Sequence, residues 1–381
     1  MDFKLTSEQL ELQKVAREYA QNELPALADE LEETGDPVPK DALMKIGEMG
    51  FLGVNTPTEY GGQGLTNLEA IIILEEFGKI SSAVGWPVFE ANAGPVKVLQ
   101  HFATDALKKR VIPKVCSGEM VVAVSMSEPG AGTGLTDLKT KAEIKGDKIV
   151  INGNKRWCSG AGHSDGYVVY ARMSDAPAAK GIGAVYVEKE AKGLSFGKQE
   201  ELMGFNGVPS ADIFFDNVKV PLTNLIGKEE GQGFYQMMNQ LPWERLLIGI
   251  TALGAIDFAL QETIKYVQER KAFNRRIMDL QNTRFKLAES KTKAEVFRSF
   301  INDCIARLIK GKLDAATASM AKYWGSQIQN EIMDECLQLH GGYGYILDYP
   351  ISRMYADARV QKIYGGSNEI MKELIARSID N

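Results

Sequence analysis

The stretch from Val121 to Asp137, VVAVSMSEPGAGTGLTD, determines how the rest of the chain is interpreted. Its first residues, Val121 to Met126, are dense in apolar and β-branched side chains, which predicts a strand. The strand breaks at Pro129 into Gly-Ala-Gly-Thr-Gly. Small residues let backbone N–H groups approach a ligand, and free amides beside hydroxyls can hold phosphate or ring oxygens. The stretch is therefore either a nucleotide-binding loop or an ordinary glycine-rich turn.

The residues after the glycines argue against a doubly wound dinucleotide fold. In that fold the glycine motif opens a helix. Here it is followed by Leu138–Ile151, which alternates like a strand. Similar short alternating segments, separated by Gly, Asp, Asn and Pro, continue to Ile226. This region is therefore predicted to be a compact β domain.

Helical patterns flank the β region on both sides. Upstream, Thr6 with Gln9 and Thr66 with Glu69 form capping boxes that predict two helix starts, and the helical region ends near Cys116. Downstream, helical periodicity predicts blocks at about 234–270, 281–310 and 313–339, with shorter pieces beyond Pro350. We expect an α+β fold with three domains: residues 1–117 (helical), 118–228 (β) and 229–381 (helical bundle).

Composition excludes several classes of protein. The 381 residues are 44% hydrophobic and 25% charged, as in soluble globular proteins, and the net charge of −6 argues against a nucleic-acid binder. The first residues lack the pattern of a signal peptide and no transmembrane helix is predicted, so we expect a cytoplasmic protein. Scattered cysteines and three dispersed histidines favour neither disulfides nor a metal site.

Pro242 lies inside the first C-terminal helical block. A proline in a helix removes one amide and crowds a preceding carbonyl. We therefore expect a bend where Trp243, Glu244 and Arg245 follow.

Seven segments together resemble the acyl-CoA dehydrogenase flavoprotein family: SMSEPGAGT, NGNKRWCSG, LPWERL, ERKAF, QLHGGYGY, YADARV and IYGGSNEI. The C-terminal half, with ATASMAKYW and NEIMKELIAR, is most similar to long-chain members. The resemblance implies an N-terminal helical domain, a middle β-barrel-like domain and a C-terminal four-helix bundle. It also implies FAD between the last two domains, and a homotetramer.

The resemblance also suggests the catalytic base. Most family members carry a glutamate in a YEG-type motif, but this chain has Tyr364, Gly365 and Gly366 there. Long-chain and isovaleryl members carry the base on a bundle helix, where LPWERL places Glu244. We expect Glu244 to be the base; the alternative is a solvated glutamate paired with an arginine. Gly365 keeps the backbone N–H that the family uses as an enolate donor.

The family's flavin contacts match two sets of positions. Trp157 is expected at the flavin edge, with a core aromatic as the alternative, and Ser159 at flavin N5. The first set is Val124, Ser125, Met126, Ser127, Gly132, Thr133, Trp157, Cys158 and Ser159. The second set resembles groups that reach FAD phosphates and adenosine, often from a neighbouring subunit: Arg270, Phe273, Gln281, Gln338, Leu339, Gly341, Gly342, Ser367 and Glu369.

The resemblance implies CoA contacts at Thr133, Arg245, Gly366 and Arg377. In the acyl region, Glu90 is either solvated, a group that recognises a polar substrate, or a second base. Three aromatic residues are interpreted either as a pocket for a short, branched or cyclic acyl group or as plain core: Trp86, Phe89 and Trp243. The chain departs from its relatives at Thr133-Gly134, where many have SD, and at Phe205–Val208, where relatives commonly show an arginine.

The implied reaction removes the proton α to a thioester carbonyl and passes a hydride from the β carbon to flavin N5. The electrons then go to electron-transferring flavoprotein. The acyl group is left open as long-chain, branched or cyclic. Alternatives are a non-oxidative lyase of the same fold, similar to a desulfinase, and a ring-specific dehydrogenase with Glu90 as base. A catalytically silent flavoprotein and an oxidase are less favoured.

Overall fold

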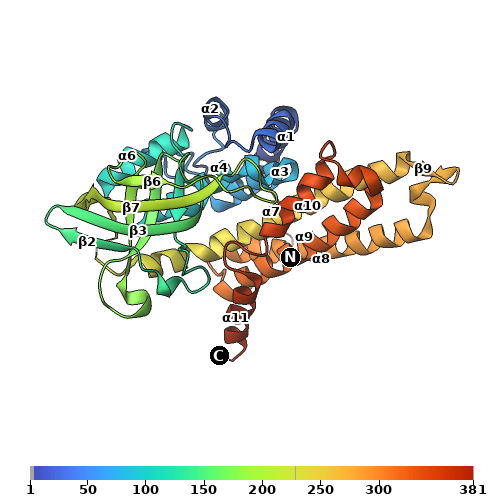
Figure 1. The fold of residues 1–381 in the computed structure, drawn as a ribbon. Helices are drawn as coiled ribbons and strands as arrows, with labels where there is room; N and C mark the ends of the chain where they lie inside the picture. The colour runs from blue at the N-terminus through green and yellow to red at the C-terminus, as the bar shows by residue number, and fades with distance from the viewer. Residues whose placement is uncertain (1–3, 228, 381) are drawn as a thin grey trace.

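The computed structural model describes residues 4–227 and 229–380, so the domain boundary expected at residue 228 lies outside the described residues. Helices, a sheet and helices again follow one another along the chain (Figure 1). Both predicted capping boxes are confirmed, at Thr6 and at Thr66. The N-terminal helices are α1 (Ser7–Thr34), α2 (Lys40–Glu48), α3 (Asn67–Ile80), α4 (Ser82–Asn92), α5 (Gly94–Phe102) and α6 (Asp105–Cys116).

The middle region forms a sheet in which β1 runs parallel to β4, with Val124 opposite Val168. The longest strands, β3 and β7, pair antiparallel, and their register shifts between Lys155 and Cys158. A shift of this kind redirects side chains. The strands are β1 (Val122–Ser125), β2 (Lys141–Lys145), β3 (Lys148–Ser159), β4 (Gly166–Arg172), β5 (Ile182–Glu188), β6 (Leu194–Phe196), β7 (Ser210–Pro221) and β8 (Leu225–Ile226).

The C-terminal helices match the predicted blocks to within a few residues. A short hairpin, β9 (Lys271–Ala272) and β10 (Arg275–Arg276), stands at the end of this domain far from the sheet (Figure 1). The connection between α9 and α10 includes the 3-10 helix η6 (Gly341–Tyr345). The helices are α7 (Gly233–Glu269), α8 (Gln281–Ile309), α9 (Ala315–His340), α10 (Pro350–Val360) and α11 (Asn368–Ile379).

Helix α7 is the central element of the bundle and packs against α3, α8 and α9. Two glycines allow these helices to lie close together. A Cβ at Gly249 would come within 3.0 Å of Ala321 O, and one at Gly325 within 2.6 Å of the Phe297 ring. The close approach brings α9 side chains next to the part of α7 that carries Glu244.

In the described part of the chain, α7 alone is long and apolar enough to cross a membrane, but 67% of its most apolar stretch is buried in the protein. Such burial is what a core helix of a soluble protein shows. The helix continues through Pro242. The bend expected there stays a prediction.

Candidate active site

The glycine-rich loop after β1 has the features of a ligand cradle. Ser125 is fully buried, and within residues 4–227 and 229–380 its hydroxyl has no hydrogen-bond partner. A Cβ placed on Gly130 or Gly132 would meet no atom within 4 Å. A buried hydroxyl without a partner is costly unless a ligand satisfies it. The loop therefore offers a polar group and open space to a bound molecule.

A buried ion pair holds this loop. Lys155 of β3 donates to a carboxylate oxygen of Glu128 (2.9 Å) and to Met126 O (2.8 Å). Glu128 also accepts from the backbone N–H groups of Lys139 (2.6 Å) and Thr140 (2.8 Å). Burial lowers the pKa of Lys155 to about 8, against the attraction of Glu128. Burial alone would raise the pKa of Glu128, but Lys155 and the amide donors hold it below its usual value.

Trp157 lies on the surface, so its alternative interpretation as a core aromatic is wrong. The residue has φ +58° at the irregular part of β3, and 57% of it is exposed. The Arg156 guanidinium stacks 4.2 Å from the ring centre and is itself paired with Asp212 and Glu200. The neighbouring Cys158 Sγ donates to Val124 O (3.2 Å) and so joins β3 to β1.

These features fit FAD. A flat ring system with polar edges needs an open loop, hydrogen-bonding groups and an aromatic wall, and β1, its loop and the end of β3 supply all three. The structure brings together the first set of expected flavin contacts, from Val124 to Thr133 and from Trp157 to Ser159, because β1 and the end of β3 are joined through Cys158.

Glu244 lies in the first half of α7 and keeps only a small exposed fraction. Burial raises the pKa of its carboxyl to about 7, although the charge of Arg245 lowers it. Among the described residues no salt bridge to Glu244 is formed, so the alternative of a solvated, arginine-paired glutamate is not what the structure shows. Arg245 is buried and instead donates through Nε to Gly365 O (3.4 Å).

The turn at Gly365–Gly366 lies beside Glu244. Both glycines have positive φ, +65° and +92°. A Cβ on Gly365 would come within 2.5 Å of the tip of Ile248, which is one helical turn after Glu244 and on the same face of α7. Ser367 then caps α11 by accepting from Ile370 N (3.5 Å), as its sequence position indicated. The turn thus lies against the part of α7 that carries Glu244.

Replacing Gly365 by alanine is expected to reduce both stability and activity. An L-residue in the left-handed region costs about 1–2 kcal/mol, and the added methyl would push Ile248 against the Glu244 face of α7. Urea unfolding and steady-state kinetics would measure the two effects. Gly146→Ala is the matched control, because Gly146 also has positive φ (+65°) but meets no atom within 4 Å and lies on a β2–β3 turn. Equal kinetic losses in both variants would contradict this account.

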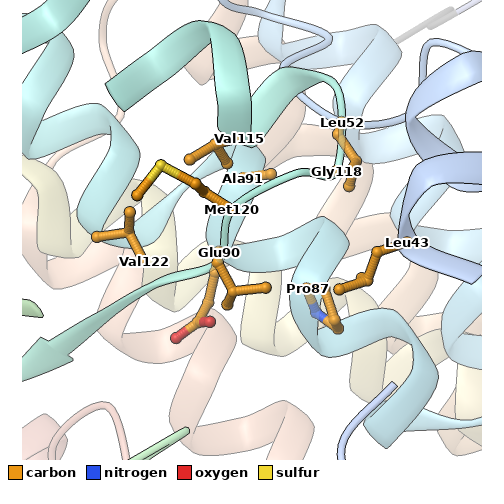
Figure 2. Close-up of a pocket in the computed structure, with 10 residues that line it drawn as sticks. Leu43, Leu52, Pro87, Glu90, Ala91, Val115, Gly118, Met120 and Val122 are labelled. Atoms are coloured by element: carbon orange, nitrogen blue, oxygen red, sulfur yellow. The ribbon is translucent and has the colours of Figure 1, made fainter. Parts of the chain in front are cut away.

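Glu90 of α4 is a second carboxyl near the site. It is 7% exposed, and it forms no ion pair among the described residues. Figure 2 shows its carboxylate pointing away from the apolar residues Leu52 and Val115. Burial raises its pKa well above the usual value; the nearby Trp86 indole opposes this and the Glu244 charge adds to it. It also lines a cavity of about 280 Å³ between the N-terminal helices and the sheet domain.

Four aromatic rings gather beside Glu90. Trp86 stacks on Phe89 (5.3 Å between ring centres) and meets Phe205 (5.5 Å) and Tyr364 (5.9 Å) edge-on. The gap that they border against Ile248 measures only about 20 Å³. Trp243 lies apart from them and donates to Asn92 O (3.3 Å). The aromatic residues therefore border a narrow pocket rather than a deep channel.

The loop at Phe205–Val208, which lacks the arginine common in relatives, is held by other groups. Phe205 N donates to the buried carboxylate of Asp357 (2.5 Å), and Asn206 donates to Glu32 (3.1 Å). Burial raises the pKa of Asp357 to about 7. These contacts tie the sheet domain to α10 and α1.

Most of the second set of expected FAD contacts lies at the far end of the bundle. Arg270 follows the end of α7, 26 residues after Glu244, which corresponds to about 40 Å at 1.5 Å per residue. Phe273 is 87% exposed in the β9–β10 hairpin, and Gln281 begins α8. The end of α9 contributes the others at this end of the bundle: Gln338, Leu339, Gly341 and Gly342. One chain does not bring these residues to the first set.

The remaining candidates lie on α11 and its entry. Ser367 caps this helix and Glu369 lies in its first turn. Arg377 in the last turn donates to Glu373 (2.8 Å) and is exposed. A CoA contact at Arg377 or at the buried Arg245 stays a prediction. Sequence reasoning gave no role to three buried charged residues that support the site: Glu128, Lys155 and Lys322.

A helical domain, a sheet domain and a helical bundle around such a site define a flavoprotein dehydrogenase, and the chain belongs to the acyl-CoA dehydrogenase family. It matches the family's N-terminal domain over residues 6–119, its middle domain over 123–218 and its C-terminal domain over 231–379. Members of this family are FAD-dependent oxidoreductases, and FAD is the cofactor that this membership gives the chain.

Among curated relatives, the rat mitochondrial long-chain specific acyl-CoA dehydrogenase is 40% identical over 367 residues, covering 95% of this chain and 84% of that protein. The caffeyl-CoA reductase-Etf complex subunit CarC of Acetobacterium woodii is 34% identical, covering 96% of each chain. The solved acyl-CoA dehydrogenase of Geobacillus kaustophilus has a TM-score of 0.95 and 33% identity over 100% of both chains.

Proposed function

We propose that this chain dehydrogenates an acyl-CoA thioester to the α,β-enoyl-CoA, with Glu244 removing the α proton. FAD, when bound, supplies the acceptor for the hydride that leaves the β carbon. The Gly365 N–H donates to the thioester oxygen as negative charge develops there. The observation that carries the proposal is a weakly acidic Glu244 on α7 whose neighbours on the same helix, Arg245 and Ile248, reach the Gly365 turn.

The chemistry of Glu244 suits this role. A general base works best when its pKa lies near the operating pH, and burial raises the pKa of Glu244 to about 7. Removal of an α proton also needs donors for the enolate, and a glycine turn presents its backbone amides without side chains in the way. The same arrangement serves the reverse reaction, in which protonated Glu244 returns the proton. Since the CarC relative is called a reductase, both directions deserve measurement.

Short, branched or cyclic acyl groups fit the pocket better than long straight chains. The aromatic cluster of Trp86, Phe89, Phe205 and Tyr364 closes the space beyond Ile248 to a gap of about 20 Å³. A water-sized gap holds no long alkyl chain unless these rings move. The rat relative is named for long chains, so the pocket favours a substrate different from the one in that name.

Anaerobic titration of the FAD-loaded protein with straight, branched and cyclic acyl-CoA thioesters tests the function. Transfer of a hydride bleaches the yellow flavin, so bleaching by one class of thioester identifies both the reaction and the substrate class. We expect bleaching by short, branched or cyclic thioesters. If no thioester bleaches the flavin, the non-oxidative lyase function replaces the proposed dehydrogenation. Bleaching by long straight-chain thioesters alone would contradict the preference for short, branched or cyclic acyl groups.

The pH dependence of the reaction follows from the pKa of Glu244. The base must be ionised, so kcat/KM for dehydrogenation is expected to rise with pH and to level off above about 7. For reduction of the enoyl-CoA the protonated acid is required, so the profile is expected to fall above the same pH. Stopped-flow rates between pH 5.5 and 9 in both directions would show this. If the rates of dehydrogenation and reduction both rise, or both fall, with pH, Glu244 is excluded as the acid–base group that the two directions share.

Glu90 supports a second candidate function, a ring-specific dehydrogenation with Glu90 as base. The specific observation is a second buried carboxyl without an ion-pair partner among the described residues, close enough to Glu244 for their charges to interact. Its carboxylate could abstract a proton from a ring carbon that Glu244 does not reach. Under this alternative, cyclic thioesters alone would bleach the flavin, and Glu90→Gln would abolish that bleaching.

We propose electron-transferring flavoprotein as the redox partner, a homotetramer as the assembly and the cytoplasm as the location. The CarC relative is named as a subunit of an Etf complex, which supports the first. Large apolar side chains exposed at the bundle tip support association: Phe273, Tyr345 and Leu347. In such an assembly a neighbouring copy would bring its Arg270 and Gln281 to this chain's flavin loop, which accounts for the separation of the two sets of contacts. Sedimentation with and without FAD measures the assembly.

A further inference from the structure

Two buried side chains with positive charge hold the Gly365–Gly366 turn from two helices. Arg245 of α7 donates to Gly365 O (3.4 Å), and Lys322 of α9 donates to Gly366 O (2.7 Å). Gly365 O belongs to the 365–366 peptide unit and Gly366 O to the 366–367 unit, so each of the two units that follow the Gly365 N–H has an external donor. The turn itself supplies little restraint, because two successive glycines can adopt many backbone conformations.

Lys322 is fully buried, which is rare for a lysine. Besides Gly366 O, its ammonium donates to Asn368 Oδ1 (2.9 Å). Asn368 is in turn bonded to Ser326 of α9, with Ser326 Oγ 3.1 Å from Asn368 Oδ1 and 3.0 Å from Asn368 Nδ2. The network joins α9 to both ends of the short connection between the turn and α11.

The direct contribution of this buried group to folding is small or unfavourable. Removing an ammonium from water costs free energy, and burial lowers the pKa of Lys322 to about 7. Apolar residues at such positions are often no less stabilising. The lysine instead restrains the backbone: by donating to Gly366 O it fixes the orientation of the 366–367 peptide unit.

We propose that Lys322 is a positioning residue for the reaction: through Gly366 O and Asn368 it holds the turn so that the Gly365 N–H faces the thioester oxygen. This inference rests on the proposed function. A displacement of about 1 Å in a reacting group can reduce a rate about 10²-fold. Loss of the Lys322 contact leaves the turn held by Arg245 alone, on the α7 side.

The chain offers a matched control for this role. Lys97 of α5 is also buried and also donates to a backbone carbonyl, Asn55 O (2.7 Å), and to a side-chain amide oxygen, Gln100 Oε1 (2.6 Å). Burial lowers its pKa to about 7 as well. It lies in the N-terminal helices, and within the described residues its hydrogen bonds go to Asn55 and Gln100 and not to the turn. Lys322→Met and Lys97→Met therefore remove similar groups from different places.

The FAD-loaded variants are compared by kinetics and by spectroscopy. Lys322→Met is expected to lower kcat about 30- to 100-fold while KM changes less than 3-fold; Lys97→Met keeps wild-type kcat even where both melting temperatures fall equally. A 3-thia-acyl-CoA, which loses its α proton but cannot pass on a hydride, reports the enolate donor directly through its charge-transfer absorbance with the flavin. This absorbance is expected to weaken in Lys322→Met only.

Ser326→Ala provides a second, milder variant if Lys322→Met does not fold, since it only loosens Asn368; a 3- to 10-fold lower kcat is expected. If the folded Lys322→Met variant or Ser326→Ala keeps the kcat and the charge-transfer absorbance of the wild type, the positioning role is overturned. The proposed function still stands in that case, provided that acyl-CoA bleaches the flavin of the wild type. Equal losses in the Lys97 variant would also overturn it. A wild type that no thioester bleaches would overturn both together.

Discussion

Replacing Glu244 by glutamine is expected to lower the rate of flavin bleaching by acyl-CoA about 10²- to 10⁴-fold, the usual contribution of a general base. Glutamine has nearly the same shape but cannot accept the α proton. FAD content, measured from the visible absorbance, should stay stoichiometric, because Glu244 lies on α7 and not on the flavin loop. Stopped-flow bleaching under anaerobic conditions measures the rate.

The same variant is expected to gain stability at high pH. Burial raises the pKa of Glu244 from an ordinary 4.5 to about 7, so between these pH values the folded protein binds a proton that the unfolded chain has released. Folding stability therefore falls as pH rises through this window. Above pH 7 the cost is about 3 kcal/mol at 1.36 kcal/mol per pKa unit, and glutamine removes it. Urea unfolding at pH 8 and pH 5 should show the gain only at pH 8.

Glu90→Gln is the informative comparison for both measurements. If Glu244→Gln bleaches as fast as wild type while Glu90→Gln does not, the base is Glu90 and the ring-specific alternative holds. If both variants are slow, the two carboxyls act together. A Glu244 variant that loses FAD would contradict the placement of this residue on the substrate side of the site.

Replacing Lys155 by methionine is expected to destabilise the protein by about 3–5 kcal/mol, because it leaves the charge of Glu128 buried without its partner. The flavin loop should be affected first, since Lys155 also holds Met126 O (2.8 Å). We expect purification without FAD, or FAD binding that is strongly weakened. Absorbance and urea unfolding measure the two effects.

Glu128→Gln is the matched variant for this pair. Glutamine retains one acceptor oxygen for the amides of Lys139 and Thr140 and removes the buried negative charge. A smaller loss of stability and a partial loss of FAD are expected. If Lys155→Met keeps stoichiometric FAD and its free energy of unfolding falls by less than about 1 kcal/mol, the loop is held by other contacts.

Local signals in the sequence predicted most of the fold. Thr6 and Thr66 begin helices because each side chain caps its own helix, three residues from its partner. The helical blocks after Gly231 follow from periodicity in the same way. The order of the strands and the register shift near Lys155 depend on pairing between distant segments, which no local pattern contains.

The candidate site was predicted unevenly for the same reason. Glu244 and the flavin loop could be named because the resemblance to the family carries them as short motifs. From the sequence alone, Lys155 and Lys322 would be predicted to lie on the surface, because a lysine is almost never fully buried without a partner. Their partners lie 27 and 44 residues away along the chain, and only the folded arrangement brings them together. Trp157 is exposed because β3 is irregular there.

The carboxylate and the glycine turn of this site stand on separate elements, Glu244 on a continuous helix and Gly365 on a short connection between two others. In a protein whose base occupies the turn itself, any sequence change there alters acid–base chemistry and oxyanion binding at once. Here the base and the backbone donor are separate residues, joined through Arg245 and Ile248. An engineer could therefore change the connection without replacing the base, provided that these two contacts with α7 are kept.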